Sequence, residues 1–412
     1  MKILHINKSI RGGAGIASYR LHEGLIAQGM DSKMMIGSLT AEDSKAYSDS
    51  IIKVPPPSKL EQKILLRIST FSGLNDLCLF NSFQIPNNSF FQTADIINFH
   101  NLQDSYFNYL SIPILTKKKP TIFTLHDMWS FTGHCSYSYD CDRWQIGCGK
   151  CPHLDVYPAI NRDNTRIEWN LKKWIYKHSN LTVVTPSQWL TKKARESLLS
   201  HLPIYHIPNG IDTKVYQPID SECCRSILGI SSEKQVLMFG AHDLKDVRKG
   251  SDLMLKALKS LPEKLKSNCL LLTFGIGGEN LSEIVGITNL NLGYLTSDRL
   301  KAIAFSAADI FLFPTRADNL PVVLQESMAC GTPMISFKVG GVPDLVRPGV
   351  TGYLANSENI DDFRNGIIEL LENQCLRNQL AENCRRVAVS EYSLELQVKR
   401  YMQLYDQVLH SK

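Results

Sequence analysis

Two carboxylates stand in a segment whose other side chains are mostly apolar, which is an unusual place for negative charge. Asp318 and Glu326 lie eight positions apart in the stretch RADNLPVVLQESMACGTPMISF, residues 316–337. An uncompensated buried charge costs far more free energy than a buried leucine contributes. Either water reaches both carboxylates, or a ligand binds beside them.

A short helix predicted over residues 321–329 places these carboxylates beside an anion site. Pro321 suits the first turn of a helix because it lacks an N–H and has a fixed φ, and Gly331 follows the predicted end. Asp318 then precedes the helix, and Glu326 lies inside it. The free N–H groups of a helix N-terminus suit a phosphate. A ligand with hydroxyls and phosphates, such as a nucleotide sugar, would satisfy all of these groups.

The elements that must position these residues alternate between strands and helices in two successive halves of the chain. Apolar runs predict strands over residues 2–7, 94–101, 120–129, 181–187, 234–241, 269–278 and 308–316. Amphipathic segments predict helices, among them residues 59–71, 251–261, 298–307 and 394–410. This alternation predicts an α/β protein with two doubly wound parallel sheets.

Ligands bind beyond the carboxyl ends of the strands in such sheets, so the residues at the ends of the predicted strands are candidates for a site. They include Gly13, Ala14, Gly15, His100, His126, Asn209, Gly275 and Asp318. Two such domains facing each other would bring these strand ends to one cleft. A histidine at a strand end can also be an ordinary core residue, and an asparagine can simply make a turn.

The composition is that of an ordinary globular protein. The chain has 412 residues, of which 43% are hydrophobic and 21% charged. No stretch reaches the roughly 18 apolar residues of a membrane span. The start, MKILHINKSI, lacks the apolar core of a signal peptide, so we expect a cytoplasmic protein. A net charge of +5 is too weak to indicate nucleic acid but permits an anionic surface or a phosphorylated substrate.

Residues 316–337 resemble the E-x7-E segment of family 4 of the retaining glycosyltransferases. Further segments resemble landmarks of that family in the family's order: GGAG, TLHDMW, IPNGID, RKGSDLML and VGGVPDLVRPGVTGYL. The resemblance covers nearly the whole chain and implies a GT-B fold, with two Rossmann-like domains facing a cleft. We therefore expect an acceptor-side domain over residues 1–207, a nucleotide-sugar-binding domain over 208–389, and a final helix within 390–412 that packs back on the first domain.

The resemblance assigns roles around a nucleoside-diphosphate sugar. Glu326 would hold the ribose hydroxyls, and Asp318 would contact the transferring sugar beside the backbone N–H groups of Asn319 and Leu320. Asp318 stands where the family has glutamate, so its side chain is one methylene shorter. Lys249 would neutralise the leaving diphosphate.

Other positions of the family motif map onto both halves of the chain. The family has an arginine further upstream, where this chain reads GAH at residues 240–242, and we expect Arg248 to substitute for it. His126 would bind the donor sugar or stabilise the reacting centre, and Tyr294 would lie against the base. The glycine loop would let the backbone approach the phosphates or the acceptor. Further expected donor contacts are His100, Asn209 and Gly275.

The expected chemistry needs no cofactor. Departure of a diphosphate builds negative charge, which two cations and a helix N-terminus can stabilise. Glu326 is not expected to be a nucleophile, because a double-displacement pair needs carboxyl groups about 5–5.5 Å apart across the reacting bond. The resemblance implies a same-face mechanism in which a diphosphate oxygen helps to deprotonate the acceptor.

Four clustered cysteines in HCSYSYDCDRWQIGCGKCP follow the TLHDMW motif: Cys135, Cys141, Cys148 and Cys151. As thiolates they could hold one structural zinc ion, with residues 148–151 as a knuckle. Free thiols are a second interpretation, and disulfides, which need an oxidising compartment, are a third. Within the family, the chain resembles members with such an insert, which would form a loop near the acceptor site.

Residues 166–177 mix Trp169, Trp174 and Tyr176 with Lys172 and other basic side chains. A basic aromatic helix can lie on an anionic membrane, here the inner face of the cytoplasmic membrane. The other interpretation is a core helix with one solvated face.

The sequence as a whole predicts a glycosyltransferase that moves a sugar from a UDP- or GDP-sugar to a glycan or lipid-linked glycan, in surface or exopolysaccharide biosynthesis. One alternative is a nucleotide-sugar-binding protein on the same fold that has lost its activity. Another is an NAD-dependent oxidoreductase that uses residues 13–18 as its fingerprint, which leaves Asp318, Glu326 and Lys249 unexplained.

Overall fold

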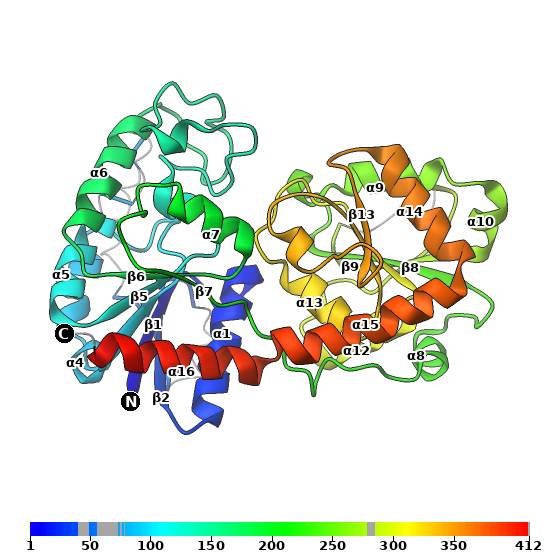
Figure 1. Ribbon diagram of the computed structural model, residues 1–412, viewed down its shortest axis with the longest axis horizontal. Coiled ribbons are helices and arrows are strands. Elements are labelled where there is room, and N and C mark those ends of the chain that lie inside the picture. Colours follow the sequence, from blue (N-terminus) through cyan, green and yellow to red (C-terminus); the bar gives the residue numbers. More distant parts are fainter. Residues whose placement is uncertain (40–48, 56–72, 75, 78, 278–284, 411–412) are drawn as a thin grey trace. The chain divides into compact units, whose positions relative to one another are not determined.

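The computed structural model describes residues 1–39, 49–55, 73–74, 76–77, 79–277 and 285–410 (Figure 1). The chain divides into two compact units: unit 1 is Met1–Asn209 with Gln397–Lys412, and unit 2 is Gly210–Leu396. The predicted junction after residue 207 lies two residues before the one observed, and residues 390–396, expected in the first domain, belong to unit 2. The helix predicted over 59–71 lies outside the described residues.

The sheet of unit 1 has seven described strands, all parallel, in the order β3-β2-β1-β4-β5-β6-β7. Their bounds are β1 Lys2–Asn7, β2 Asp31–Ile36, β3 Ile51–Lys53, β4 Ile96–Phe99, β5 Thr121–Thr124, β6 Thr182–Thr185 and β7 Ile204–His206. The helices of this unit are α1 Gly12–Ala27, α4 Ser89–Thr93, α5 Ile112–Lys118, α6 Thr165–Lys177, α7 Gln188–Arg195 and, from Gln397 on, α16 Leu394–His410. Short 3-10 helices are η1 Asn81–Asn87, η2 Tyr109–Ser111, η3 Trp129–Phe131 and η4 Arg143–Gln145.

The final helix, α16, packs on the sheet of unit 1 through polar side chains. The amide of Asn98 in β4 donates to the Tyr405 hydroxyl over 3.0 Å, and the hydroxyls of Thr124 in β5 and Tyr401 lie 3.0 Å apart. Both tyrosines are buried. The predicted return of the last helix to the first domain is therefore confirmed.

The sheet of unit 2 has six described strands, again parallel, in the order β10-β9-β8-β11-β12-β13. The strands are β8 Gln235–Asp243, β9 Cys269–Ile276, β10 Thr288–Asn291, β11 Ile310–Phe313, β12 Met334–Phe337 and β13 Gly352–Ala355. The helices are α8 Ser221–Leu228, α9 Ser251–Lys259, α10 Glu263–Asn268, α12 Asp298–Ala307, α13 Val322–Ala329, α14 Ile360–Glu372 and α15 Gln374–Tyr392, with 3-10 turns η5 Val247–Lys249 and η6 Val342–Asp344.

Strand β11 shows why this sheet reads as continuous apolar runs in the sequence. Phe311 and Phe313 pack into one buried cluster with residues of α12, α13 and α15. Ile310 and Leu312 pack into a second cluster, with residues of α9 and α14. Helices thus cover both faces of the sheet (Figure 1), as parallel sheets require because both faces are apolar. The predicted pair of doubly wound sheets is confirmed.

No helix in the described ranges is both long enough and apolar enough to cross a membrane.

Candidate active site

In unit 2 the strand order reverses between β8 and β11, and the segments after these two strands contact each other. The backbone N–H of Arg316 and the hydroxyl of Thr315 donate to the Arg248 carbonyl over 2.8 and 3.0 Å. Open α/β sheets bind ligands at such a switch point, outside the carboxyl ends of the strands. The loop after β11 and the turn η5 are therefore the first place to look for a site.

Two glycines allow these loops to approach each other closely. Gly250 has a φ of +71°, and a Cβ atom there would lie 1.9 Å from the Pro314 carbonyl oxygen. Gly340 has a φ of +52°, and its Cβ would lie 2.0 Å from the Asp318 carbonyl oxygen. Any larger side chain at either position would push the loop after β11 away from its neighbours.

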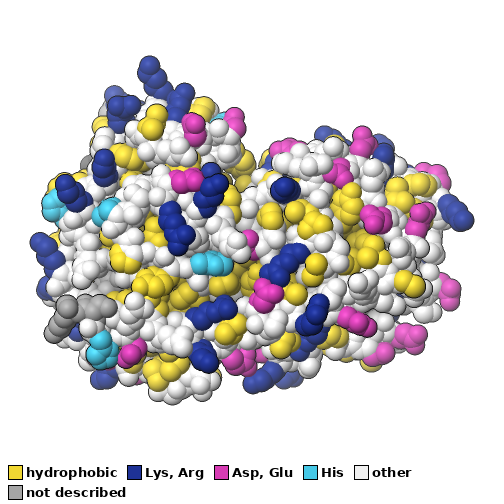
Figure 2. Space-filling model, viewed as in Figure 1, with side chains coloured by type: hydrophobic (Ala, Val, Ile, Leu, Met, Phe, Trp, Pro, Cys, Tyr) yellow, Lys and Arg dark blue, Asp and Glu magenta, His cyan; other side chains and the backbone are white. Residues whose placement is uncertain are grey.

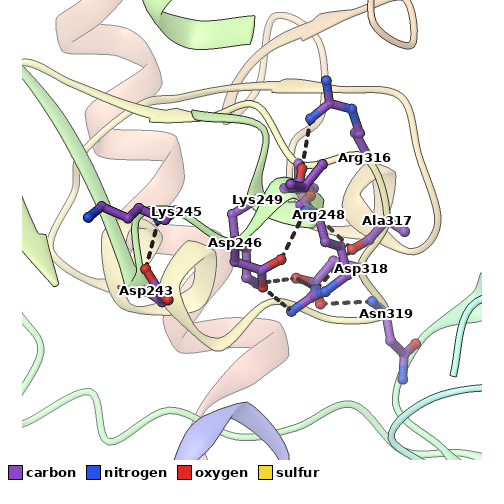
Figure 3. A network of polar contacts seen from close by, with 11 residues as sticks. Asp243, Lys245, Asp246, Arg248, Lys249, Arg316, Ala317, Asp318 and Asn319 are labelled. Atoms are coloured by element: carbon purple, nitrogen blue, oxygen red, sulfur yellow. Dashed lines mark hydrogen bonds and ion pairs between the residues drawn. The ribbon is translucent and has the colours of Figure 1, made fainter. Parts of the chain in front are cut away.

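The carboxylate of Asp318 lies between two cations (Figure 3). Its Oδ2 atom is 2.7 Å from Lys249 Nζ and 3.2 Å from Arg248 Nη1. Its Oδ1 atom accepts the backbone N–H of Asn319 at 2.9 Å. The predicted residues Arg248, Lys249, Asp318 and Asn319 therefore come together, and the first question raised by the sequence is answered: Asp318 is compensated from within the protein.

The electrostatics of this cluster follow from burial and charge. Burial favours the neutral form of Asp318, but the positive charges of Lys249 and Arg248 outweigh it and hold the pKa of Asp318 below its ordinary value. Burial lowers the pKa of Lys249, and the Asp318 charge opposes that shift. Arg248 is further held by the Ala317 carbonyl, 3.0 Å away, and by Asp246, 3.4 Å away. Sequence reasoning did not predict Asp246 as a partner.

Helix α13 begins at Val322, four residues after Asp318, with Pro321 at its N-cap, one residue after the predicted start. Glu326 in this helix is buried, and its Oε1 atom accepts the Tyr216 hydroxyl at 3.1 Å. Tyr216 is completely buried and was missed by the sequence reasoning, which had no periodic or motif signal for it. The side chain of Leu320 packs in the core of unit 2, so only its backbone can reach a ligand.

A second group of predicted residues lies at the carboxyl end of β9 and after β10. Gly275 has a φ of +128°, and a Cβ there would lie 2.1 Å from the Ala241 carbonyl oxygen. Its N–H donates to the Gly293 carbonyl over 2.8 Å, which holds the segment before Tyr294. The half-exposed Tyr294 ring meets the His242 ring edge to face, with centroids 5.1 Å apart. His242 is the histidine of the GAH segment, residues 240–242. This segment therefore supplies an imidazole ring at the place where the family has an arginine.

In unit 1 the predicted glycine loop forms the first turn of α1, which starts at Gly12. Gly13 and Ala14 follow it in that turn. At Gly15 a Cβ atom would lie 2.7 Å from the backbone of Ser9 and Ile10, so the turn packs directly on the chain leaving β1. Asn209 is buried at the end of unit 1's first segment.

Three histidines form a line across the carboxyl ends of the neighbouring strands β1, β4 and β5. His126 Nε2 lies 3.0 Å from His100 Nδ1, and His100 Nε2 lies 3.0 Å from His5 Nδ1. His5 and His100 are almost inaccessible, whereas His126 is partly exposed. His100 uses both ring nitrogens within the protein, so this geometry favours a supporting role over the direct donor contact expected from the sequence. His5 was not predicted as a site residue, because in the sequence it is a single polar residue inside an apolar strand.

Burial keeps these rings neutral. It lowers the pKa of His126 to about 4, and it lowers the pKa of His100 and of His5 well below the ordinary value. Next to His126, the partly buried Asp127 accepts the Gln103 amide at 2.8 Å and the Trp129 N–H at 2.8 Å. Burial raises the pKa of Asp127 to about 6.

The four clustered cysteines are partly buried free thiols. Burial raises the pKa of Cys135 to about 12 and that of Cys148 to about 11, and the neighbouring thiols contribute. Cys148 Sγ accepts the Gly133 N–H at 3.2 Å, and Cys151 Sγ lies 3.4 Å from His134 Nε2. In the described ranges no group of three or more His, Cys, Asp or Glu side chains is placed to hold a metal ion. The zinc site stays a prediction.

The basic aromatic helix α6 is in part a core helix. Trp169, Lys172 and Tyr176 are buried, and the Lys172 ammonium donates to the carbonyls of Trp129 and Thr132 over 2.7 and 3.1 Å. The opposite side of the helix exposes Trp174 together with basic and apolar side chains: Arg166, Ile167, Lys173 and Lys177.

Comparison with known proteins covers both units. The family model described as Glycosyltransferase Family 4 matches residues 11–215, and the model of Glycosyl transferases group 1 matches residues 224–387. The chain is 28% identical over 353 residues to a protein of Escherichia coli (strain K12) named as the colanic acid biosynthesis glycosyl transferase WcaC, covering 82% of this chain and 83% of that one. It is 26% identical over 231 residues to the N-acetyl-alpha-D-glucosaminyl L-malate synthase of Bacillus anthracis, covering 55% and 60%.

Solved structures share the fold of the whole chain at low sequence identity. Sucrose-phosphate synthase from Thermosynechococcus elongatus superposes with a TM-score of 0.72 at 18% identity, covering 100% of both chains. Anabaena HepE in complex with UDP gives 0.69 at 16% identity, covering 99% of this chain and 100% of that one. WaaG, a glycosyltransferase involved in lipopolysaccharide biosynthesis, gives 0.68 at 17% identity over 100% of both chains.

Proposed function

Because the chain belongs to family 4 of the glycosyltransferases, we propose that it is a retaining hexosyltransferase that passes a sugar from a nucleoside-diphosphate donor to a glycan or lipid-linked glycan. The observation that carries the proposal is the cluster of Arg248, Lys249 and Asp318 at the switch point of unit 2, just before α13. The cluster combines cations for phosphate with a carboxylate for hydroxyls, at the edge where such sheets bind ligands.

The two cations suit the leaving diphosphate. The Lys249 ammonium has three N–H donors, and its hydrogen bond to Asp318 uses one of them. Positive charge held in place before the reaction stabilises the negative charge that develops on the departing group. The N–H groups that begin α13 add a partial positive charge beside it.

The proposed reaction keeps the anomeric configuration without a covalent enzyme intermediate. The bond between the anomeric carbon and the diphosphate oxygen breaks, and the bond to the acceptor oxygen forms on the same face. The acceptor proton passes to a diphosphate oxygen. Asp318 binds the hydroxyls of the transferring sugar, and Glu326, fixed by the Tyr216 hydroxyl, binds the ribose.

His126 and the glycine turn complete the proposal from unit 1. His126 contacts the donor sugar, and the first turn of α1 presents backbone N–H groups to the phosphates or the acceptor. The ring of Tyr294, supported by His242, lies against the base. We propose UDP or GDP as the nucleoside diphosphate of the donor, since HepE was crystallised with UDP and a relative from Corynebacterium glutamicum is named as GDP-mannose-dependent.

The names of similar proteins support polysaccharide synthesis as the setting. WcaC is named for colanic acid biosynthesis and WaaG for lipopolysaccharide biosynthesis. Lipopolysaccharide is, by its name, a lipid-linked glycan. We propose a glycan or lipid-linked glycan as the acceptor here, reached from the cytoplasmic side of the membrane.

Donor turnover tests the function. Purified protein would be incubated with UDP- and GDP-sugars, with release of nucleotide as the readout, and the anomeric configuration of the first product would be read by NMR. We expect turnover with one donor and its loss in Lys249→Ala and Glu326→Ala. Exposed residues of the same types serve as controls, Lys259→Ala in α9 and Glu369→Ala in α14, and should keep the activity.

Donor binding without turnover would favour the inactive nucleotide-sugar-binding alternative. Two departures from the family motif are the reason to test that alternative in this chain. They are the aspartate at position 318 and the absence of the family arginine in the GAH segment, residues 240–242. No stabilisation by any nucleotide sugar, with stabilisation by NAD instead, would overturn the proposal altogether.

We further propose that the exposed side of α6 contacts anionic membrane. Trp174, 51% exposed, and Ile167, 54% exposed, are seven residues apart and so share one helix face with Lys173 and Lys177 close by. Such a stripe suits the interface of a bilayer. Sedimentation with phosphatidylglycerol vesicles should recover the wild type and not Trp174→Ala with Lys173→Ala, and equal recovery with neutral vesicles would contradict the proposal.

A further inference from the structure

The line of three histidines restricts where protons can sit. Each of its two N···N contacts, 3.0 Å long, needs one N–H and one lone pair. The ring planes are nearly parallel, 24° apart for His5 and His100 and 27° for His100 and His126. His100 is buried between the other two rings, where a second proton would put a charge in an apolar setting. Neutral rings then allow two arrangements only, which run in opposite directions along the line.

In the first arrangement the protons point toward the protein surface. His5 donates from Nδ1 to His100, His100 donates from Nδ1 to His126, and His126 carries its own proton on Nδ1. In the second, every proton moves to the other nitrogen, so that His126 donates from Nε2 and keeps a lone pair on Nδ1.

The buried end of the line distinguishes the two arrangements. Within the described part of the chain, His5 Nε2 is buried and has no hydrogen-bond partner. The first arrangement leaves a lone pair there, whereas the second leaves an N–H. Buried N–H groups without a partner are rarer in proteins than under-satisfied acceptors. His22 does not change this, because its ring meets the His5 ring at 77° and its own Nδ1 is paired with the Ser32 hydroxyl at 2.7 Å.

We propose that His5 and His100 are positioning residues that hold His126 as the neutral tautomer protonated on Nδ1. The role of His126 toward the sugars, described next, rests on the proposed function. His126 acts toward the sugars as a hydrogen-bond donor, because Nε2 accepts from His100 and Nδ1 already has a proton. It does not act as the base that removes the acceptor proton, which leaves that proton for the diphosphate oxygen.

The tautomer can be measured without any activity assay. In protein labelled with 15N-histidine, two-bond 1H–15N correlation spectra at neutral pH distinguish a protonated ring nitrogen from an unprotonated one. The His126 signals are assigned from their loss in His126→Gln. We expect Nδ1 to be protonated and Nε2 unprotonated. A proton on Nε2, or a mixture of both forms, would overturn the proposal even if the protein is an active transferase.

Variants of His5 test the positioning role. His5→Leu removes the first donor, so we expect a tautomer mixture at His126 and a fall in kcat/KM on the order of tenfold, the size seen when an orienting partner is lost. His5→Asn places an amide N–H near the Nδ1 position and should restore both readouts. His201→Leu, at an exposed histidine, is the control.

Unchanged His126 signals in a folded His5→Leu protein would refute the positioning role. If His5→Leu does not fold, the wild-type spectrum and that of His5→Asn decide the question. A wild-type protein with the expected tautomer but no turnover with any donor would refute the proposed function while leaving the tautomer assignment in place.

Discussion

Lys249 Nζ lies 2.7 Å from Asp318 Oδ2, and the same oxygen is 3.2 Å from Arg248. The side chains of Lys249 and Asp318 are 18% and 12% exposed, so this is a largely buried ion pair that joins the turn after β8 to the loop after β11. The negative charge of Asp318, which the sequence alone does not explain, is thus neutralised by the protein itself before any ligand binds (Figure 3).

Removal of one partner of this pair should cost stability. Asp318→Asn leaves two cations together, and Lys249→Met leaves Asp318 with Arg248 alone, so we expect each to lower the free energy of unfolding by roughly 3 kcal/mol. Urea unfolding at neutral pH measures this. Lys259→Met, an exposed lysine in α9, should stay within about 0.5 kcal/mol of the wild type. A double variant as stable as either single one would show that the two residues act as a pair.

Gly250→Ala should damage the site through its backbone. The alanine would have to hold a φ of +71° and a Cβ 1.9 Å from the Pro314 carbonyl oxygen. Gly229→Ala is a matched control, because Gly229 has a φ of +69° with nothing within 4 Å of its Cβ position. We expect the control to lose about 1–2 kcal/mol, the cost of the left-handed conformation alone. Gly250→Ala should lose clearly more and bind the donor more weakly; equal losses would contradict the steric argument.

Stability should fall in mild acid because of buried neutral histidines. Burial lowers the pKa of His22 from 6.5 to about 4, so the unfolded chain takes up a proton between these values and the folded chain does not. The His22 contribution is therefore complete above pH 6.5 and is lost as the pH falls toward 4, by about 3 kcal/mol.

The difference between wild type and His22→Gln isolates this effect. Asp76 and Asp127, whose pKa values burial raises to about 7 and about 6, change stability in the opposite sense over the same range. They are common to both proteins and cancel in the difference. We expect His22→Gln to gain on the wild type as the pH falls from 7 to 4, measured by urea unfolding at each pH. A pH-independent difference would contradict the prediction, because it would show that His22 takes up a proton equally readily in the folded and unfolded states.

The clustered cysteines should be unreactive in metal-free protein. With pKa values of about 12 and about 11, Cys135 and Cys148 stay protonated at pH 8, and a thiol is a far weaker nucleophile than a thiolate. Iodoacetamide followed by mass spectrometry should modify the exposed Cys223 and Cys375 first. Prompt modification of Cys135 would contradict the burial argument.

Metal analysis tests the zinc prediction separately. Purified protein should contain about one zinc ion per chain if the four thiols bind it as thiolates, and Cys148→Ser should reduce that content. Zinc-free protein with an unchanged melting temperature after chelation would remove the zinc interpretation and leave free thiols.

The elements of the fold were largely readable from the sequence, because buried parallel strands appear as apolar runs and helices as amphipathic ones. The helices predicted over 298–307 and 394–410 have those bounds in the structure. The positions of Asp318, Lys249 and Glu326 near strand ends and the start of α13 could likewise be predicted from local signals.

The partners of these residues could not be predicted, since they depend on how distant segments meet. Asp318 and Lys249 are 69 positions apart, Tyr216 and Glu326 are 110, and His5 and His100 are 95. Those separations are fixed by strand order and register, which local patterns do not contain. The supporting role of His100, expected to touch the donor, became visible only when β1, β4 and β5 were placed side by side.

The order of the segments has a consequence for synthesis of the protein. Unit 2 is inserted between Asn209 and Gln397 of unit 1, and its two ends meet where Ile211 N donates to the Tyr392 carbonyl at 2.8 Å and Leu394 N donates to the Ile211 carbonyl at 2.9 Å. The first half of the chain to leave the ribosome is thus the last to be completed. Until Tyr401 and Tyr405 emerge, Thr124 and Asn98 lack the hydroxyl groups that cover them, so nascent unit 1 exposes that face while unit 2 can already fold.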